Sequence, residues 1–225
     1  MSRFRGEKKF SLRYAIGELV LITLGIYLAF AVNNWNEGRK ELGLEQFYLT
    51  NLLADVERSI RQLERHQGLS TSQLEAAGIL DGLLAQGSRV DRDSLRSYLN
   101  AFNTNPRFRV SNYSYQSLLQ SGDYRIIRSD SLRNTLDRYF LELLPGVVTT
   151  EGYYLDRLDV HYYPVKESVY MARSNEFINI NRLFDPVFKD NVFALPAYIR
   201  QELSHIKAAL EAGGALAEVI RGEIK

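Results

Sequence analysis

Hydrophobic and polar positions divide the chain into a long apolar run near the N-terminus and a remainder in which apolar residues recur every three or four positions. The run covers residues 14–35 and contains one charged residue, Glu18. Because a helix rises about 1.5 Å per residue, roughly 20 residues cross a hydrocarbon core of about 30 Å. The pattern therefore predicts a transmembrane helix over 14–35, with a basic leader over 1–13 before it and a domain over 36–225 after it.

Basic residues are concentrated before the apolar run. Five precede it and two follow it closely, in the order Arg3, Arg5, Lys8, Lys9, Arg13, Arg39 and Lys40. Lys and Arg accumulate on the cytoplasmic side of membrane spans, so the leader is predicted to be cytoplasmic and the domain extracytoplasmic, which at a bacterial inner membrane means periplasmic. Arg13, Tyr14 and Trp35 are the predicted anchors at the two membrane interfaces.

An alternative interpretation of the run is a cleaved signal peptide. Ala29-Phe30-Ala31 has the small-x-small pattern that signal peptidase recognises. Against cleavage, the run is long for a signal core, and no Pro or Gly separates it from the polar helix that continues through Asn33 and Asn34. An uncleaved anchor is the preferred interpretation.

Beyond the span, the apolar spacing is that of amphipathic helices. Apolar residues at 49, 52, 53, 56, 60 and 63 predict a helix that continues directly from the membrane. Gly68–Ser72 is a weak point where this helix is expected to bend or break, and Gly87 is its expected stop. A second helix is expected after Asp91, with its body at 94–102, followed by a turn at 103–106.

The rest of the chain has the same helical period. Further helices are expected at 113–120 ended by Gly122, at 131–144 capped by Asp130 and closed by Pro145-Gly146, at 153–170 with a kink or break at Pro164, and at 199–224. Residues 175–196 are the least regular part. The last helix has a stripe in steps of three and four that needs a partner, and the helix following the span is expected to pair with it antiparallel. No segment has the strand period, so the predicted class is all-α, with a transmembrane helix continuing into an extracytoplasmic helical bundle.

Composition limits the classes of function. The 225 residues are 45% hydrophobic with a net charge of +1, which suits one medium-sized domain with its own core. The near-neutral charge, with acidic and basic residues interleaved, disfavours nucleic-acid binding. The absence of cysteine excludes disulfides, thiolate nucleophiles and thiolate metal ligands.

One face of the predicted span has the pattern of a helix–helix contact. Glu18, Ile22, Gly25 and Ala29 share this face, and the small pair Gly25 and Ala29 lets two helix backbones approach closely in lipid. We expect homo-oligomerisation through it. Two other interpretations stay open: Glu18 reaches the inner headgroups, or the face lines an ion or proton path together with Asn33 and Asn34.

No residue pattern predicts catalysis or a cofactor. The local group Asp156, Asp159 and His161 is a poor candidate for a metal site, because His161 points away from the two carboxylates on a regular helix. The chain has no nucleophile elbow, phosphate-binding glycine loop or metalloprotease helix motif. We therefore expect no catalytic, cofactor or metal residues.

Two stretches resemble a family of uncharacterised bacterial single-span membrane proteins. The first is Tyr-Ala-Ile-Gly-Glu-Leu-Val-Leu from Tyr14, followed by Asn-Asn-Trp-Asn-Glu from Asn33. The second is Tyr-Gln-Ser-Leu-Leu-Gln-Ser-Gly from Tyr115. The resemblance implies a membrane-anchored helical protein and assigns no catalytic residue.

Together these features predict a membrane-anchored extracytoplasmic helical protein that acts in interaction or scaffolding. Its expected partners are the lipid bilayer and further copies of itself, with a second membrane protein left open and nucleic acid excluded. The alternatives are an oligomeric channel or transport accessory subunit that uses the Glu18 and Gly25 face, and an anchored periplasmic enzyme or sensor subunit.

Overall fold

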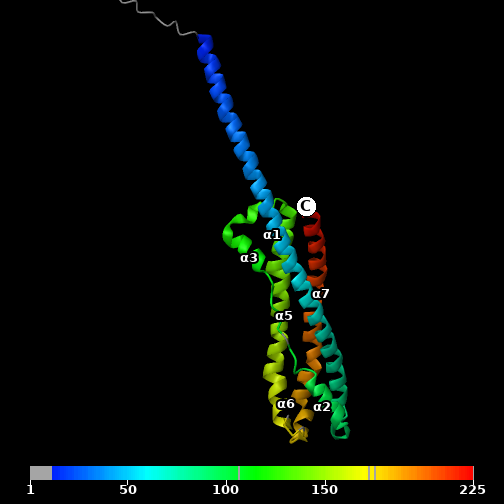
Figure 1. Ribbon diagram of the computed structural model, residues 1–225. Coiled ribbons are helices and arrows are strands. Elements are labelled where there is room, and N and C mark those ends of the chain that lie inside the picture. Colours follow the sequence, from blue (N-terminus) through cyan, green and yellow to red (C-terminus); the bar gives the residue numbers. More distant parts are fainter. Residues whose placement is uncertain (1–11, 106, 172, 175, 225) are drawn as a thin grey trace, which may run out of the picture. The chain divides into compact units, whose positions relative to one another are not determined.

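The computed structural model of the chain describes residues 12–105, 107–171, 173, 174 and 176–224, with side chains from Ile16 onward. In chain order the elements are α1 (Leu12–Ala85), η1 (Gly87–Arg89), α2 (Arg92–Asn100), α3 (Tyr113–Ser121), η2 (Asp123–Ile126), α4 (Asp130–Asp137), η3 (Arg138–Leu143), α5 (Leu144–Arg157), η4 (Leu158–Tyr162), α6 (Tyr163–Val169), β1 (Tyr170–Met171), β2 (Glu176–Phe177), η5 (Ile180–Phe184) and α7 (Pro186–Glu223). Nearly all the described residues are helical (Figure 1), which confirms the predicted class in this coarse form. The expected absence of strands is wrong by one two-residue antiparallel pair, β1 with β2.

The chain divides into two compact units, residues 1–47 and 48–225. In the first unit, α1 is the one helix in the described part of the chain that is long and apolar enough to cross a membrane. Its most apolar 18-residue window has a mean hydropathy of 1.9, and none of that window is buried within the protein. The polar Thr23 side chain donates its hydroxyl to the carbonyl of Leu19 at 2.8 Å, so it adds no unpaired polar group to this apolar surface.

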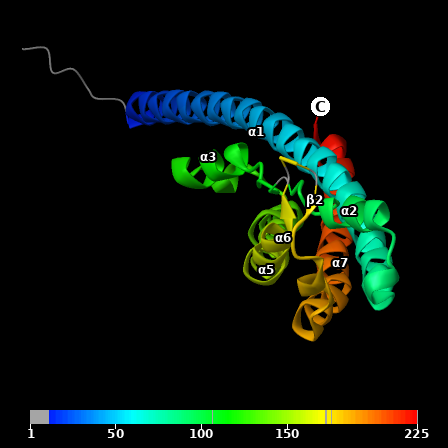
Figure 2. The ribbon, with the colours of Figure 1, turned by 90° about the horizontal axis from the view of Figure 1, so that it is seen from below.

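In the second unit, the part of α1 from Tyr48 onward, the continuous helical column of α5 and α6, and α7 surround a common interior (Figure 2). Glu57 of α1 forms an ion pair with Arg221 of α7, while His66 bonds to Glu202. The partner's number falls as the α1 number rises, so the two helices run antiparallel. The expected pairing of the helix after the span with the last helix is confirmed.

Two apolar clusters form the core of this unit. One joins α1 to the π-helical segment η3, the start of α5 and the C-terminal part of α7, with Leu52, Leu63, Phe140, Leu144, Ile206 and Ile220 among its buried members. The other joins α1 to α2, η4 and the N-terminal part of α7, with Leu80, Leu84, Leu95, Tyr162, Phe188 and Ile199 among its members. Each contacting helix buries one stripe of its three-and-four pattern, which is the usual source of stability for a bundle.

Local signals placed several helix ends correctly. Gly87 and Gly122 have positive φ values of 63° and 78°, which only glycine adopts without strain, and they follow the ends of α1 and α3. Asp91 caps α2 by accepting the backbone N–H of Ser94 at 2.8 Å. The expected weak point at Gly68–Ser72 does not break the helix, because α1 runs through it and buries Ser70 against α7.

The predicted cap Asp130 is wrong by one residue, since Ser129 accepts the backbone N–H of Leu132. The other differences between the expected and the observed helices lie at prolines. Pro145-Gly146 does not close the helix: the wider π-helical turn of η3 ends just before Pro145 and accommodates a residue that has no N–H. Pro164 lies in the first turn of α6, directly after the π-helical η4, so the helix expected over 153–170 does not break there. The last helix begins earlier than expected, at Pro186, because Asp185 caps it and proline suits its first turn.

Candidate functional site

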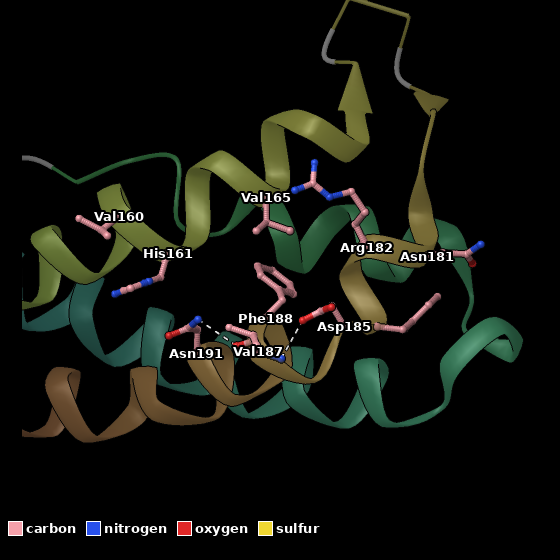
Figure 3. Close-up of a pocket in the computed structure, with 10 residues that line it drawn as sticks. Val160, His161, Val165, Asn181, Arg182, Asp185, Val187, Phe188 and Asn191 are labelled. Atoms are coloured by element: carbon pink, nitrogen blue, oxygen red, sulfur yellow. Dashed lines mark hydrogen bonds between the residues drawn. The ribbon is translucent and has the colours of Figure 1, made fainter.

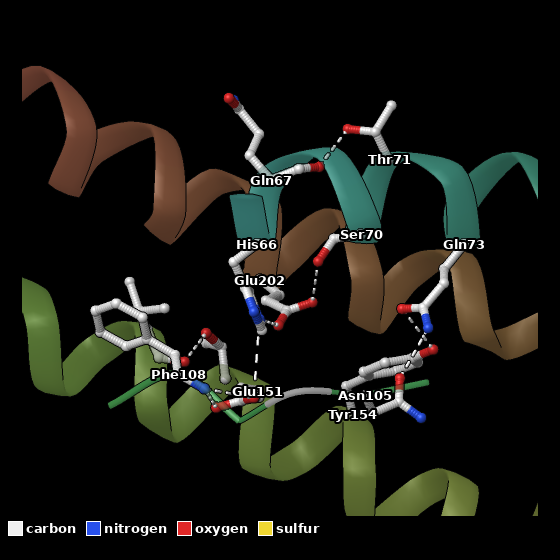
Figure 4. A network of polar contacts seen from close by, with 12 residues as sticks. His66, Gln67, Ser70, Thr71, Gln73, Asn105, Phe108, Glu151, Tyr154 and Glu202 are labelled. Atoms are coloured by element: carbon white, nitrogen blue, oxygen red, sulfur yellow. Dashed lines mark hydrogen bonds and ion pairs between the residues drawn. The ribbon is translucent and has the colours of Figure 1, made fainter. Parts of the chain in front are cut away.

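A layer of buried polar side chains separates the two apolar clusters (Figure 4). The helices α1, α5 and α7 all contribute to it at the same level of the bundle. Its members are His66, Ser70, Gln73, Thr150, Glu151 and Glu202. Below and above this level most buried residues of the same helices are apolar, with Asp55 and Ser59 of α1 and Lys166 of α6 as polar exceptions. Because burying a charge costs several kcal/mol unless it is paired, the layer is the most chemically distinctive part of the core.

Glu202 is the centre of the layer. It is 1% exposed, and its two carboxylate oxygens are bound by different groups of α1. Oε1 lies 2.8 Å from Nε2 of His66, and Oε2 accepts the hydroxyl of Ser70 at 3.1 Å. A second carboxylate, that of Glu151 on α5, lies 3.8 Å from the same His66 nitrogen. One imidazole therefore lies between two buried carboxylates from two other helices.

The electrostatics of this centre favour a protonated imidazole. Burial alone would lower the pKa of His66, but the hydrogen bond and negative charge of Glu202, together with the charge of Glu151, raise it above its ordinary value of 6.5. Burial also raises the pKa of Glu151, although the Phe108 N–H and the charges of His66 and Arg107 oppose this rise. The centre thus retains protons that these groups would release in water at the same pH.

The layer also fixes the extended segment between α2 and α3. Both oxygens of Glu151 accept the backbone N–H of Phe108, at 3.0 and 3.1 Å. Further along the layer, the Gln73 amide donates to the carbonyl of Thr104 at 3.2 Å and to Oδ1 of Asn105 at 2.8 Å. The cavity between these groups measures only about 10 Å³, which is too small for a substrate. Chemically, the layer can hold a proton and set the register of three helices and one extended segment.

An open pocket lies at the opposite end of the second unit from the C-terminus, among η4, α6, η5 and α7 (Figure 3). Its volume is about 570 Å³. Phe188 and Val165 supply apolar surface, while His161, Arg182 and Asp185 supply polar groups. Asp185 is already engaged, since it accepts the N–H of Val187 at 2.8 Å. The pocket can receive a ligand that has both apolar and polar parts.

The residues predicted for the span lie on the exposed surface of α1 in the first unit. Ile22 is 56% exposed, and no described atom of a neighbouring element lies within 4 Å of the position that a Cβ on Gly25 would take. Glu18 and Ala29 are also exposed, so the oligomer face stays a prediction. Trp35 is 65% exposed, with the Arg39 guanidinium 5.2 Å from its ring centroid.

The other sequence predictions fall partly outside the described side chains. Those of the anchors Arg13 and Tyr14 lie outside them, as do the whole of Arg3, Arg5, Lys8 and Lys9 in the leader. Among the residues that the structure does describe, no three His, Asp or Glu side chains are grouped to hold a metal ion, and Asp156, Asp159 and His161 form no such group.

Sequence reasoning missed the polar layer. Its members lie far apart in the chain, yet each has a local signal, because a charged or polar residue occupies a core-facing position of a helical stripe. Glu202 stands between the buried Ile199 and Ile206, at the three-and-four spacing, and His66 stands three residues after the buried Leu63. An ionisable residue in such a position predicts a buried partner on a neighbouring helix.

Comparison with known proteins gives one family and no individual relative. Neither the curated proteins nor the solved structures include a match to this chain. A family of unknown function, DUF6090, matches residues 18–157, from the predicted span to the end of α5. The match covers more than half of the 225 residues and includes both His66 and Glu151 of the polar layer. The chain therefore belongs to the DUF6090 family, a family of unknown function.

Proposed function

We propose that this chain is a single-span protein of the bacterial inner membrane whose domain acts outside the cytoplasm as a helical interaction or scaffold module. The observation that carries the proposal is the apolar window of α1, none of which is buried within the protein. Apolar surface of that length is unfavourable in water and matches the thickness of a hydrocarbon core. The second unit, by contrast, buries its apolar residues in two clusters of its own.

The proposed orientation rests on the distribution of charge. Five Lys or Arg residues precede the span and two follow it closely, which favours a cytoplasmic N-terminus. The domain would then lie in the periplasm. Its proposed partners are the bilayer and further copies of the same chain.

Single cysteines test the anchor and its orientation cleanly, because the chain has none of its own. Ser2→Cys marks the leader, and Lys207→Cys marks an exposed site on α7, where the lysine side chain is 73% exposed. In cells with a permeable outer membrane, an impermeant maleimide is expected to label Lys207→Cys directly and Ser2→Cys only after lysis. Both variants are expected in the membrane fraction after a carbonate wash.

Two outcomes contradict this proposal. Labelling of Ser2→Cys in intact cells, with protection of Lys207→Cys, reverses the orientation. A soluble mature chain whose measured mass corresponds to a sequence that begins after Ala31 shows that the run is a cleaved signal peptide. Lys207→Cys loses only a 4.0 Å ion pair with Glu211 on the surface, so the substitution itself leaves the fold intact.

We also propose that the span associates through the face of Glu18, Ile22, Gly25 and Ala29. Replacing Gly25 by leucine fills the space in which a second backbone would lie, since no residue that the structure describes occupies it. Gly25→Leu is expected to abolish most of the dimer or higher oligomer captured by crosslinking of the full chain in native membranes.

Ala31→Leu is the matched control, because it adds similar bulk on another side of the same helix. It is expected to leave the crosslinked species unchanged. Equal amounts of crosslinked species in both variants and the parent chain would remove this face as the interface. A wet Glu18 face, seen as conductance in reconstituted bilayers, would instead favour the alternative of an oligomeric channel or transport accessory.

A further inference from the structure

A second pocket of the domain is lined by arginines. It lies between α1 and the extended segment that follows α2, and its volume is about 310 Å³. Its lining residues are Gln62, Arg65, His66, Arg107, Phe108 and Arg109. We call it the arginine pocket. Half of its lining side chains carry a permanent positive charge. His66, which also belongs to the buried polar layer, forms part of its wall.

The extended segment presents two of these arginines side by side. Alternate residues of an extended chain point to the same side, so Arg107 and Arg109 share one face while Phe108 between them points inward. Phe108 is 6% exposed, and its ring centroid lies 6.3 Å from that of His66. Its backbone N–H is held by both oxygens of Glu151 (Figure 4). The two arginines are therefore mounted on a backbone that is already fixed.

The charges of the pocket are not neutralised within the described part of the chain. Arg65, Arg107 and Arg109 form no ion pair there, whereas other arginines of the domain do, namely Arg58, Arg61, Arg96, Arg133 and Arg221. Arg107 is near enough to Glu151 to lower the pKa of that carboxyl, but it forms no ion pair with it. The two carboxylates of the layer carry at most two negative charges and already face the His66 imidazole, so they cannot neutralise three guanidinium groups as well.

We propose that the arginine pocket binds a phosphate-type oxyanion. A guanidinium group presents a planar fork of donors that fits the oxygens of phosphate, and charge-assisted bonds of this kind are about twice as strong as neutral ones. Three such groups, with the Gln62 amide beside them, match a doubly charged anion with several acceptor oxygens better than a single carboxylate. The phosphate group is either free in solution or part of a membrane lipid headgroup.

Two measurements on the full chain in an uncharged detergent test the proposal and separate the two sources. The first is calorimetric titration with inorganic phosphate, and the second is the amount of anionic phospholipid that stays bound through purification. The variant is R107Q/R109Q, and the matched control R89Q/R200Q removes two exposed arginines that do not line this pocket.

Saturable phosphate binding that weakens about tenfold or more in R107Q/R109Q, but not in the control, supports a free phosphate ligand. Retention of anionic lipid that is lost in R107Q/R109Q alone supports a headgroup. Equal behaviour of both double variants, or the absence of either form of binding by the parent chain, overturns the proposal. Unchanged far-UV circular dichroism shows that a loss of binding is not a loss of fold.

Discussion

Replacing Glu202 by alanine is expected to reduce the free energy of unfolding by about 3–5 kcal/mol. The substitution leaves the His66 imidazole, 8% exposed, without its 2.8 Å partner, and the Ser70 hydroxyl without its acceptor. Breaking a buried pair from one side is costly because the remaining charge stays buried and uncompensated. The measurement is urea denaturation of the full chain in mild detergent, with unfolding monitored by circular dichroism at 222 nm.

Glu211→Ala is the control on the same helix. Glu211 has a side chain that is 70% exposed, and its ion pair with Lys207 is long, at 4.0 Å. A surface substitution of this kind changes stability by about 0.5 kcal/mol or less. If Glu202→Ala costs no more than Glu211→Ala, the polar layer does not carry the role in stability that its burial indicates.

The pH dependence of stability separates the charge of Glu202 from its packing. The folded state raises the pKa of His66 above 6.5, so this contribution to stability is complete below pH 6.5 and is lost as the pH rises through the raised value. The raised pKa of Glu151 acts in the same direction from its ordinary value of 4.5 upward. Stability is therefore expected to fall as the pH rises above about 6.5. Glu202→Gln removes the charge that most raises the pKa of His66, so it is expected to flatten this slope.

The parts of the fold that the sequence predicted correctly depend on local chemistry. A glycine that must adopt a positive φ, such as Gly122, ends a helix whatever surrounds it, and an aspartate that caps, such as Asp91, reaches a donor three residues away. The apolar window of α1 is also a property of one continuous segment. By contrast, Pro145 was expected to end a helix, and only the wider turn before it allows the helix to continue.

The polar layer depends on residues that no local window contains. His66 and Glu202 are separated by 136 positions, and their contact exists because α1 and α7 run antiparallel at the right register. The sequence indicated that pairing from the stripe of α7, but it did not indicate which polar residues would meet. The arginine pocket was missed for the same reason, since Arg65 is brought to Arg107 and Arg109 only when the extended segment packs on α1.

Replacing Gly213 by alanine is expected to reduce the free energy of unfolding by about 1–3 kcal/mol, although alanine is normally the better residue inside a helix. A Cβ at this position would lie 2.8 Å from the Tyr139 hydroxyl and 3.1 Å from Cγ1 of Ile60. Tyr139 is fully buried in η3 and cannot move its ring into solvent. The glycine therefore lets α7 approach both α1 and η3 closely. The same denaturation experiment measures how much free energy of unfolding the Gly213→Ala variant loses.

The adjacent Gly214 provides the matched control, because in the described part of the chain no neighbouring atom lies within 4 Å of the Cβ it would acquire. Gly214→Ala is expected to stabilise the domain by about 0.5–1 kcal/mol through helix propensity.

Tyr139→Phe removes the closest clashing atom, a buried hydroxyl that has no hydrogen-bond partner among the described residues. In the double variant with Gly213→Ala it is expected to recover about 0.5 kcal/mol or more. Only partial recovery is expected, since Ile60 and the Tyr139 ring still lie 3.1 Å from the new methyl group. Equal effects of alanine at 213 and 214 would contradict the close approach of these helices.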